Sequence, residues 1–100
     1  MRVVVLPVAA SEFRDAVIYY EQLQSGLGSR FRDEVNRHIQ WIRKNPTLPR
    51  IRNKRYRRVN LKVFPYYLAY SIWDNKIWVL AIANSYRKPE YWIHRSDNLL

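Results

Sequence analysis

The sequence predicts an α+β fold in which an antiparallel helical hairpin packs on a small antiparallel β-sheet. Two observations predict it: apolar residues recur at helical spacing in the first half, and β-branched and aromatic runs fill the second half. A short N-terminal strand and a short basic, aromatic C-terminal tail complete the chain. One hundred residues are the usual length of one domain, so we expect a single domain over residues 1–100. The predicted order is β–α–α–β–β–β.

The N-terminal part predicts a strand followed by a helix. Arg2 to Leu6 is a β-branched run, and Pro7 suits the first turn of a helix because its missing N–H is no loss there. We expect the first helix over Val8–Gln24, ended by Gly26. Its apolar residues Phe13, Ala16, Val17, Tyr20 and Leu23 recur at helical spacing. Its outer face is predicted to carry Glu12, Arg14, Asp15 and Glu21.

A tight link predicts a second helix antiparallel to the first. Leu27-Gly28-Ser29 forms the link, with Ser29 as a candidate helix cap, and Asn45-Pro46 ends the helix. The apolar stripe of this helix consists of Phe31, Val35, Ile39 and Ile42.

The second half predicts a loop and three strands. Thr47 to Lys54 is interpreted as the loop, and Tyr56 to Leu61 as a strand whose Val59 and Leu61 face the helices. Phe64–Trp73 and Ile77–Ala83 form a hairpin, because Asp74-Asn75 tolerates the left-handed conformation of a tight turn. One core is expected to contain Phe13, Val17, Tyr20, Phe31, Val35, Ile39, Leu68 and Val79.

Charge is the strongest compositional signal. The net charge is +10, which favours a polyanionic partner. Residues 35–73 contain no acid, and their basic residues are Arg37, Arg43, Lys44, Arg50, Arg52, Lys54, Arg55, Arg57, Arg58 and Lys62. The chain has no Cys and no apolar run long enough to span a membrane, so we expect a soluble cytoplasmic protein. No motif predicts a cofactor or a metal site.

Several short motifs occur together in a characteristic order. They are Tyr19-Tyr20-Glu21, Gly26-Leu27-Gly28 with Arg30-Phe31, Glu34-Val35, Pro46, Arg58-Val59, Phe64-Pro65-Tyr66, Tyr70, the strand 77–83, and Arg87-Lys88-Pro89-Glu90-Tyr91-Trp92 with Arg95. In this order the chain resembles the RelE/ParE superfamily of bacterial toxins, nearest to the ParE-like plasmid-stabilisation branch. The resemblance implies a toxin of a type II toxin–antitoxin system and a helical hairpin on a sheet.

Members of this superfamily have one of two activities, and the residues of this chain favour one of the two. RelE-like members cleave mRNA on the ribosome, whereas ParE-like members are reported to poison DNA gyrase without being nucleases. RelE-like enzymes commonly carry an Arg in the central strand, where this chain has Tyr66-Tyr67, and many relatives carry His where it has Asn84. Without that His the chain lacks the best base at neutral pH. Our leading hypothesis is therefore a toxin that acts by binding.

Two alternatives remain open. The first is a metal-independent, ribosome-dependent mRNA endonuclease that uses Arg58, Lys62, Arg87 and Tyr91. The second is a non-toxic basic nucleic-acid-binding module. Tyr56, Tyr67 and Trp73 could stack on bases, although packing within the fold is the favoured use, as it is for Trp92.

The partner implied by the resemblance is a small acidic antitoxin that forms a hetero-oligomer with this chain. Its tail could add a strand to an open sheet edge or lay a helix in a groove. The residues expected to bind antitoxin or target are Arg52, Arg55, Arg57, Arg58, Arg87, Lys88 and Tyr91.

Overall fold

The computed structural model describes residues 1–99, with side-chain environments up to Asp97. The elements in chain order are β1 (Arg2–Val5), α1 (Pro7–Leu23), α2 (Leu27–Lys44), β2 (Arg57–Asn60), β3 (Tyr66–Trp73), β4 (Lys76–Asn84) and the 3₁₀ helix η1 (Ile93–Leu99). The order β–α–α–β–β–β is confirmed. Within the described residues, neither long helix has a stretch apolar enough to cross a membrane.

The four strands form one mixed sheet in the order β1-β4-β3-β2. β2, β3 and β4 are antiparallel neighbours, as predicted. β1 instead runs parallel to β4, which corrects the expectation of a purely antiparallel sheet. The β-branched run showed that a strand exists, but a residue pattern carries no information about strand direction. β1 and β2 are the two edge strands, and we call the unpaired side of β2 the free edge.

The hairpin between β3 and β4 forms as the sequence predicts. Asp74 and Asn75 form the turn and have φ values of 53° and 56°. Both therefore adopt the left-handed conformation that a two-residue hairpin turn needs. Trp73 pairs with Lys76 directly across the turn.

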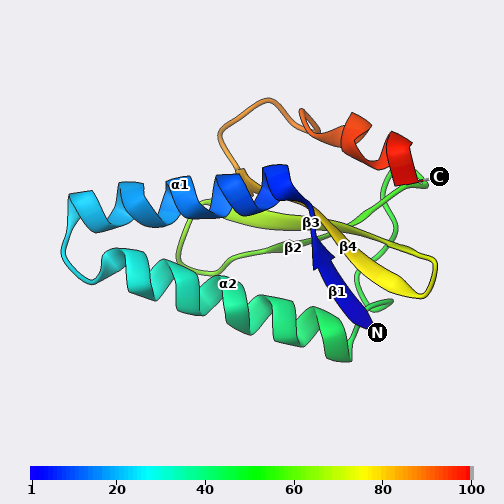
Figure 1. Ribbon diagram of the computed structural model, residues 1–100, viewed down its shortest axis with the longest axis horizontal. Helices are drawn as coiled ribbons and strands as arrows, with labels where there is room; N and C mark the ends of the chain where they lie inside the picture. The colour runs from blue at the N-terminus through cyan, green and yellow to red at the C-terminus, as the bar shows by residue number, and fades with distance from the viewer. Residues whose placement is uncertain (100) are drawn as a thin grey trace.

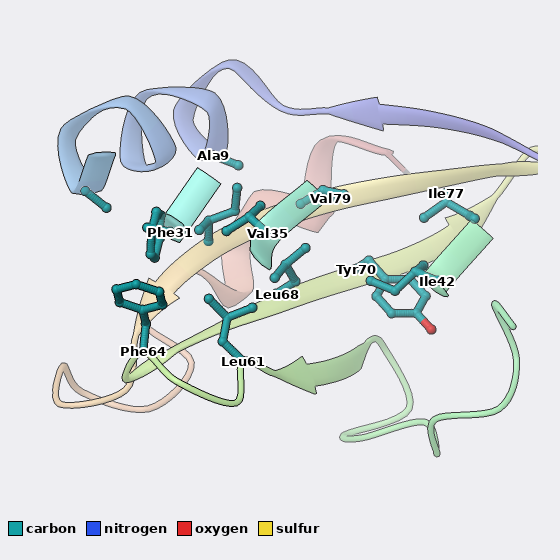
Figure 2. Close-up of a cluster of buried hydrophobic side chains, with 12 residues drawn as sticks. Ala9, Phe31, Val35, Ile42, Leu61, Phe64, Leu68, Tyr70, Ile77 and Val79 are labelled. Atoms are coloured by element: carbon teal, nitrogen blue, oxygen red, sulfur yellow. The ribbon is translucent and has the colours of Figure 1, made fainter. Parts of the chain in front are cut away.

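The main core fills the space between the two helices and the sheet (Figure 2). Phe31, Val35, Leu68 and Val79 are fully buried there. The other predicted core residues, Phe13, Val17, Tyr20 and Ile39, are partly buried and pack against this cluster. In Figure 2, Phe31 and Phe64 lie at one end of the core, and Ile42, Tyr70 and Ile77 lie at the other.

The link between the helices differs from its prediction. α2 begins at Leu27 after Gly26, whose φ is 87°, so Ser29 lies inside the helix and does not cap it. The capping acid comes from α1: the Glu21 carboxylate accepts backbone N–H groups from Gly26 at 2.9 Å and Gly28 at 3.1 Å. These N–H groups have no partner within α2, and a negative charge there is favourable to the helix dipole.

A second cluster covers the face of the sheet opposite the helices, which we call the back face. Residues 85–97, the tail, cross this face, and Figure 1 shows η1 and α2 on opposite sides of the strands. Trp92 is 1% exposed, and its Nε1 donates to the Tyr67 hydroxyl at 2.8 Å. Tyr56 and Tyr67 are also buried. The prediction that these aromatic residues pack within the fold is confirmed for Tyr56, Tyr67 and Trp92, whereas Trp73 is 42% exposed.

Candidate functional site

Two arginines of β2 point to opposite faces of the sheet because successive side chains of a strand alternate. Arg57 donates from Nε to the Pro49 carbonyl oxygen at 2.9 Å. The Arg58 guanidinium lies on the back face, 3.8 Å from the centre of the Tyr67 ring. β2 therefore presents one cation on each side of its free edge.

Arg52 and Arg55, the other two arginines of the predicted set, belong to the turn before β2. Arg52 forms a single backbone bridge with Tyr56. Arg55 contacts the tail, where it donates to the Ser96 hydroxyl and pairs with Asp97. Hydrogen bonds from His94 and then from Arg55 lower the pKa of Asp97. The four predicted arginines therefore do not form one cluster, and Arg55 is engaged by an acid of the same chain.

A groove runs between α2 and the free edge of the sheet; we call it the edge groove. Its volume is about 530 Å³, and its lining consists of Glu34, Arg37, His38, Trp41, Val59, Asn60, Lys62 and Val63. Trp41 is 39% exposed and Val63 68% exposed, so the groove offers apolar surface. Arg37 and Lys62 supply positive charge.

The acid among the groove residues is turned away from solvent. Glu34 is 3% exposed, and its carboxylate accepts the backbone N–H groups of Lys62 and Val63. This contact holds the segment after β2 against α2. Because Glu34 is occupied in this way, the exposed charges of the groove are those of Arg37 and Lys62.

A polar cluster lies where β4 continues past the end of β1. Glu12 of α1 accepts the backbone N–H of Ile82 at 3.1 Å and two N–H groups of Arg95, at 2.9 and 3.1 Å. Arg95 also donates to the Leu80 carbonyl oxygen at 3.0 Å. Glu12 and Arg95 thus satisfy β4 backbone groups that β1 does not reach. The prediction that Glu12 faces outward is wrong.

Tyr91 joins this cluster through its hydroxyl, which donates to the Glu12 carboxylate. Burial, together with this hydrogen bond, raises the pKa of Tyr91 to about 12. The Arg87 guanidinium lies 3.7 Å from the centre of the Tyr91 ring. Arg87 and its neighbour Lys88 are exposed.

The cluster forms one wall of a shallow pocket of about 310 Å³, which we call the tail pocket. It is lined by Glu12, Asp15, Ala16, Tyr19, Tyr66, Ile82, Asn84, Arg87 and Tyr91. The structure therefore brings Arg87, Tyr91 and Asn84 together. Neither His38 nor His94 belongs to this lining: His38 lies in the edge groove, and His94 contacts Asp97.

The four residues named for the nuclease alternative do not share this pocket. Lys62 lines the edge groove beside β2, whereas Arg87 and Tyr91 line the pocket beside β4. β3 lies between those two strands. Arg58 stacks on Tyr67 of the back face.

Sequence reasoning missed Glu12 and Arg95. A signal for Glu12 exists, since it lies three residues after Ala9 and four before Ala16, both buried. Small residues at those helical spacings leave room for an inward-facing carboxylate. Arg95 could not be paired with it, because 83 residues separate the two.

These observations define a small basic protein that carries a helical hairpin on a four-stranded sheet, with an open basic edge and a tail folded over the back face. The model for the ParE toxin of the type II toxin–antitoxin system, parDE, matches residues 3–89, and the chain belongs to this family. A search of curated proteins finds no match. The family match ends before Glu90, so Tyr91 and Arg95 lie beyond it.

Proposed function

We propose that this ParE family member inhibits growth by binding a cellular target, with DNA gyrase as the first candidate, and that it does not hydrolyse RNA. The observation that carries the proposal is the state of Tyr91 in the tail pocket. Its proton is held by Glu12, and its pKa of about 12 keeps the hydroxyl protonated at neutral pH. A general base works best with a pKa near the working pH, so this hydroxyl is poorly suited to take up a proton.

The other groups of the tail pocket support the same proposal. Asn84 is a neutral amide and cannot accept a proton in this pH range. The Glu12 carboxylate is already shared by Arg95, Tyr91 and a backbone N–H. Arg87 could bind a phosphate, but positive charge supplies only part of the rate enhancement when no base removes the 2′-hydroxyl proton.

Expression in cells without an antitoxin tests the target. We expect growth arrest accompanied by double-strand DNA breaks, and a transcript pool without codon-specific cuts. Arrest with codon-specific cuts and intact DNA would support the nuclease alternative. No arrest at all would support the non-toxic alternative.

We further propose that the edge groove and the free edge of β2 bind an acidic antitoxin in the cytoplasm. Trp41 and Val63 would supply apolar contacts, and Arg37 and Lys62 would receive carboxylates. A strand added to β2 would satisfy its unpaired backbone groups. Its side chains would reach Arg57 on one face and Arg58 on the other.

The kinetics of antitoxin binding test this surface. Charge mainly sets the encounter rate, whereas buried apolar contacts mainly set the dissociation rate. The double variant Arg37→Glu/Lys62→Glu should lower the on-rate by about tenfold or more at low salt. Trp41→Ala should mainly raise the off-rate. Stopped-flow binding with the cognate antitoxin measures both.

A matched control separates local from overall charge. Arg14→Glu/Arg30→Glu changes the net charge equally at exposed positions outside the groove. It should lower the on-rate much less. Equal losses in the two double variants would remove the edge groove from the interface.

A further inference from the structure

The tail leaves one end of the back face uncovered. Trp92 and Ile93 of the tail cover the end that holds Tyr56 and Tyr67. At the end near the β3–β4 turn, Trp73 is 42% exposed and Trp78 is half-buried. Contiguous exposed apolar surface of this kind often marks a binding site.

The two indoles are held in a fixed arrangement. Trp73 pairs with Lys76 and Trp78 with Ser71, so the tryptophans are diagonal neighbours across the hairpin. Their ring centres are 6.0 Å apart at an interplanar angle of 49°. The Trp78 Nε1 donates to the Trp73 carbonyl oxygen at 2.9 Å. The tight turn at Asp74 and Asn75 fixes the tip of the hairpin beside them.

Two cations lie beside this pair. Val3 and Val5 pack on the helix side, so alternation places Arg2 on the back face, next to Lys76. The Lys76 ammonium lies 5.8 Å from the centre of the Trp78 ring. It also lies 3.5 Å from Asp74, in an exposed pair. Such exposed pairs contribute little, so an incoming phosphate can replace the Asp74 carboxylate.

We propose that Trp73, Trp78, Arg2 and Lys76 form a binding surface for single-stranded nucleic acid. Unpaired bases stack on aromatic rings without sequence preference, and the phosphates are neutralised by the cations beside the rings. The net charge of +10 favours the approach of a polyanion. A duplex would not fit this surface, because its bases are already stacked on each other. The surface lies outside the edge groove and the tail pocket, so the inference is independent of the function proposed above.

Fluorescence anisotropy with labelled oligonucleotides tests the stacking. Oligo-dT and oligo-rU of about 12 nucleotides fall within the site sizes of known single-strand binders. Trp73→Ala should weaken binding of both by roughly 5- to 150-fold, the equivalent of one lost base stack. Trp73→Phe should retain most of the affinity because the ring remains. Trp41→Ala, which removes a similarly exposed tryptophan from the edge groove, should leave the affinity unchanged.

The salt dependence tests the cations. Each phosphate contact to a single strand adds about 0.7 to the slope of log K against log salt, so Lys76→Gln and Arg2→Gln should each reduce the slope by about that amount. Arg14→Gln should not reduce it. Tighter binding of oligo-rU than of oligo-dT would add a 2′-hydroxyl contact to the surface, and equal binding would fit stacking alone.

Three results would overturn the proposal. They are an unchanged affinity in Trp73→Ala, an equal loss in Trp41→Ala, and a duplex that binds as tightly as the single strands whether or not Trp73 is present. Any of these would leave overall charge, or another surface, as the source of binding.

Discussion

Glu12 connects three parts of the chain through one carboxylate. It belongs to α1, accepts a backbone N–H of β4, and binds Tyr91 and Arg95 of the tail. The Glu12 and Arg95 side chains are 16% and 20% exposed, so solvent screens this ion pair only weakly. One wall of the tail pocket is therefore fixed, and Tyr91 serves there as a structural hydrogen-bond donor.

The hydrogen bond from Tyr91 to Glu12 predicts that the free energy of unfolding of wild type and of Tyr91→Phe depends differently on alkaline pH. Tyr91→Phe should lower the free energy of unfolding at neutral pH by about 1.5–3 kcal/mol, because the lost bond ends on a charged carboxylate. The pKa of Tyr91 is raised from 10.0 to about 12 in the folded chain. Its contribution is therefore complete below pH 10 and is lost as the pH rises through 12.

Urea unfolding, followed by tryptophan fluorescence from neutral to strongly alkaline pH, measures this contribution. Burial also raises the pKa values of Tyr56 and Tyr70 to about 12, but both residues remain in the variant and cancel in the comparison. The difference between wild type and Tyr91→Phe should narrow as the pH rises. A difference that stays constant would show that Tyr91 acts by packing alone.

At the scale of the elements, the helical hairpin and the sheet depend on one aromatic contact region. Phe31 of α2 is fully buried, and its ring centre lies 5.0–6.1 Å from those of Phe13, Tyr20, Phe64 and Tyr66. The pairs with Phe64 and Tyr66 are edge-to-face, an arrangement that adds to the free energy of burial.

Phe31→Ala should therefore lower the free energy of unfolding by roughly 3–5 kcal/mol. Chemical denaturation measures this value. Trp41→Ala, at a partly exposed position of the same helix, is the control and should cost much less. A loss below about 1 kcal/mol in Phe31→Ala would contradict the packing described, since cavities in a rigid core cost more.

Local patterns were sufficient for most elements. The stripe that contains Phe31 and Val35 identified α2, and Asp74-Asn75 identified the hairpin turn. Features that depend on distant partners were missed. Ser29 met the local rule for a cap, but the Glu21 carboxylate arrives from the preceding helix and takes that role. The direction of β1 is set by its pairing with β4, whose partner residues lie more than seventy positions further along the chain.

The candidate site was less predictable than the fold. Arg55 was expected to face a partner, but Asp97 of the tail pairs with it. Arg57 and Arg58 are adjacent in sequence, yet alternation sends them to opposite faces. Charge in the sequence predicted a partner class, whereas the distribution of that charge over surfaces depends on how the chain folds.

For the whole molecule, the proposed binding surfaces lie on separate parts of the sheet. The edge groove lies between α2 and the free edge of β2, and the tail pocket lies beside β4. The proposed nucleic-acid surface occupies the uncovered end of the back face. Antitoxin and a nucleic acid could therefore bind at the same time.

The central claim is that the protein acts by binding and not by cleaving RNA. Incubation with translating ribosomes in a reconstituted system, followed by mapping of mRNA ends, tests it most directly. We predict no codon-specific cuts above those in a reaction without the protein, and the same pattern for Arg87→Ala and Tyr91→Phe. Codon-specific cuts that appear with the wild-type chain and disappear in both variants would contradict the claim and identify the tail pocket as a ribonuclease site.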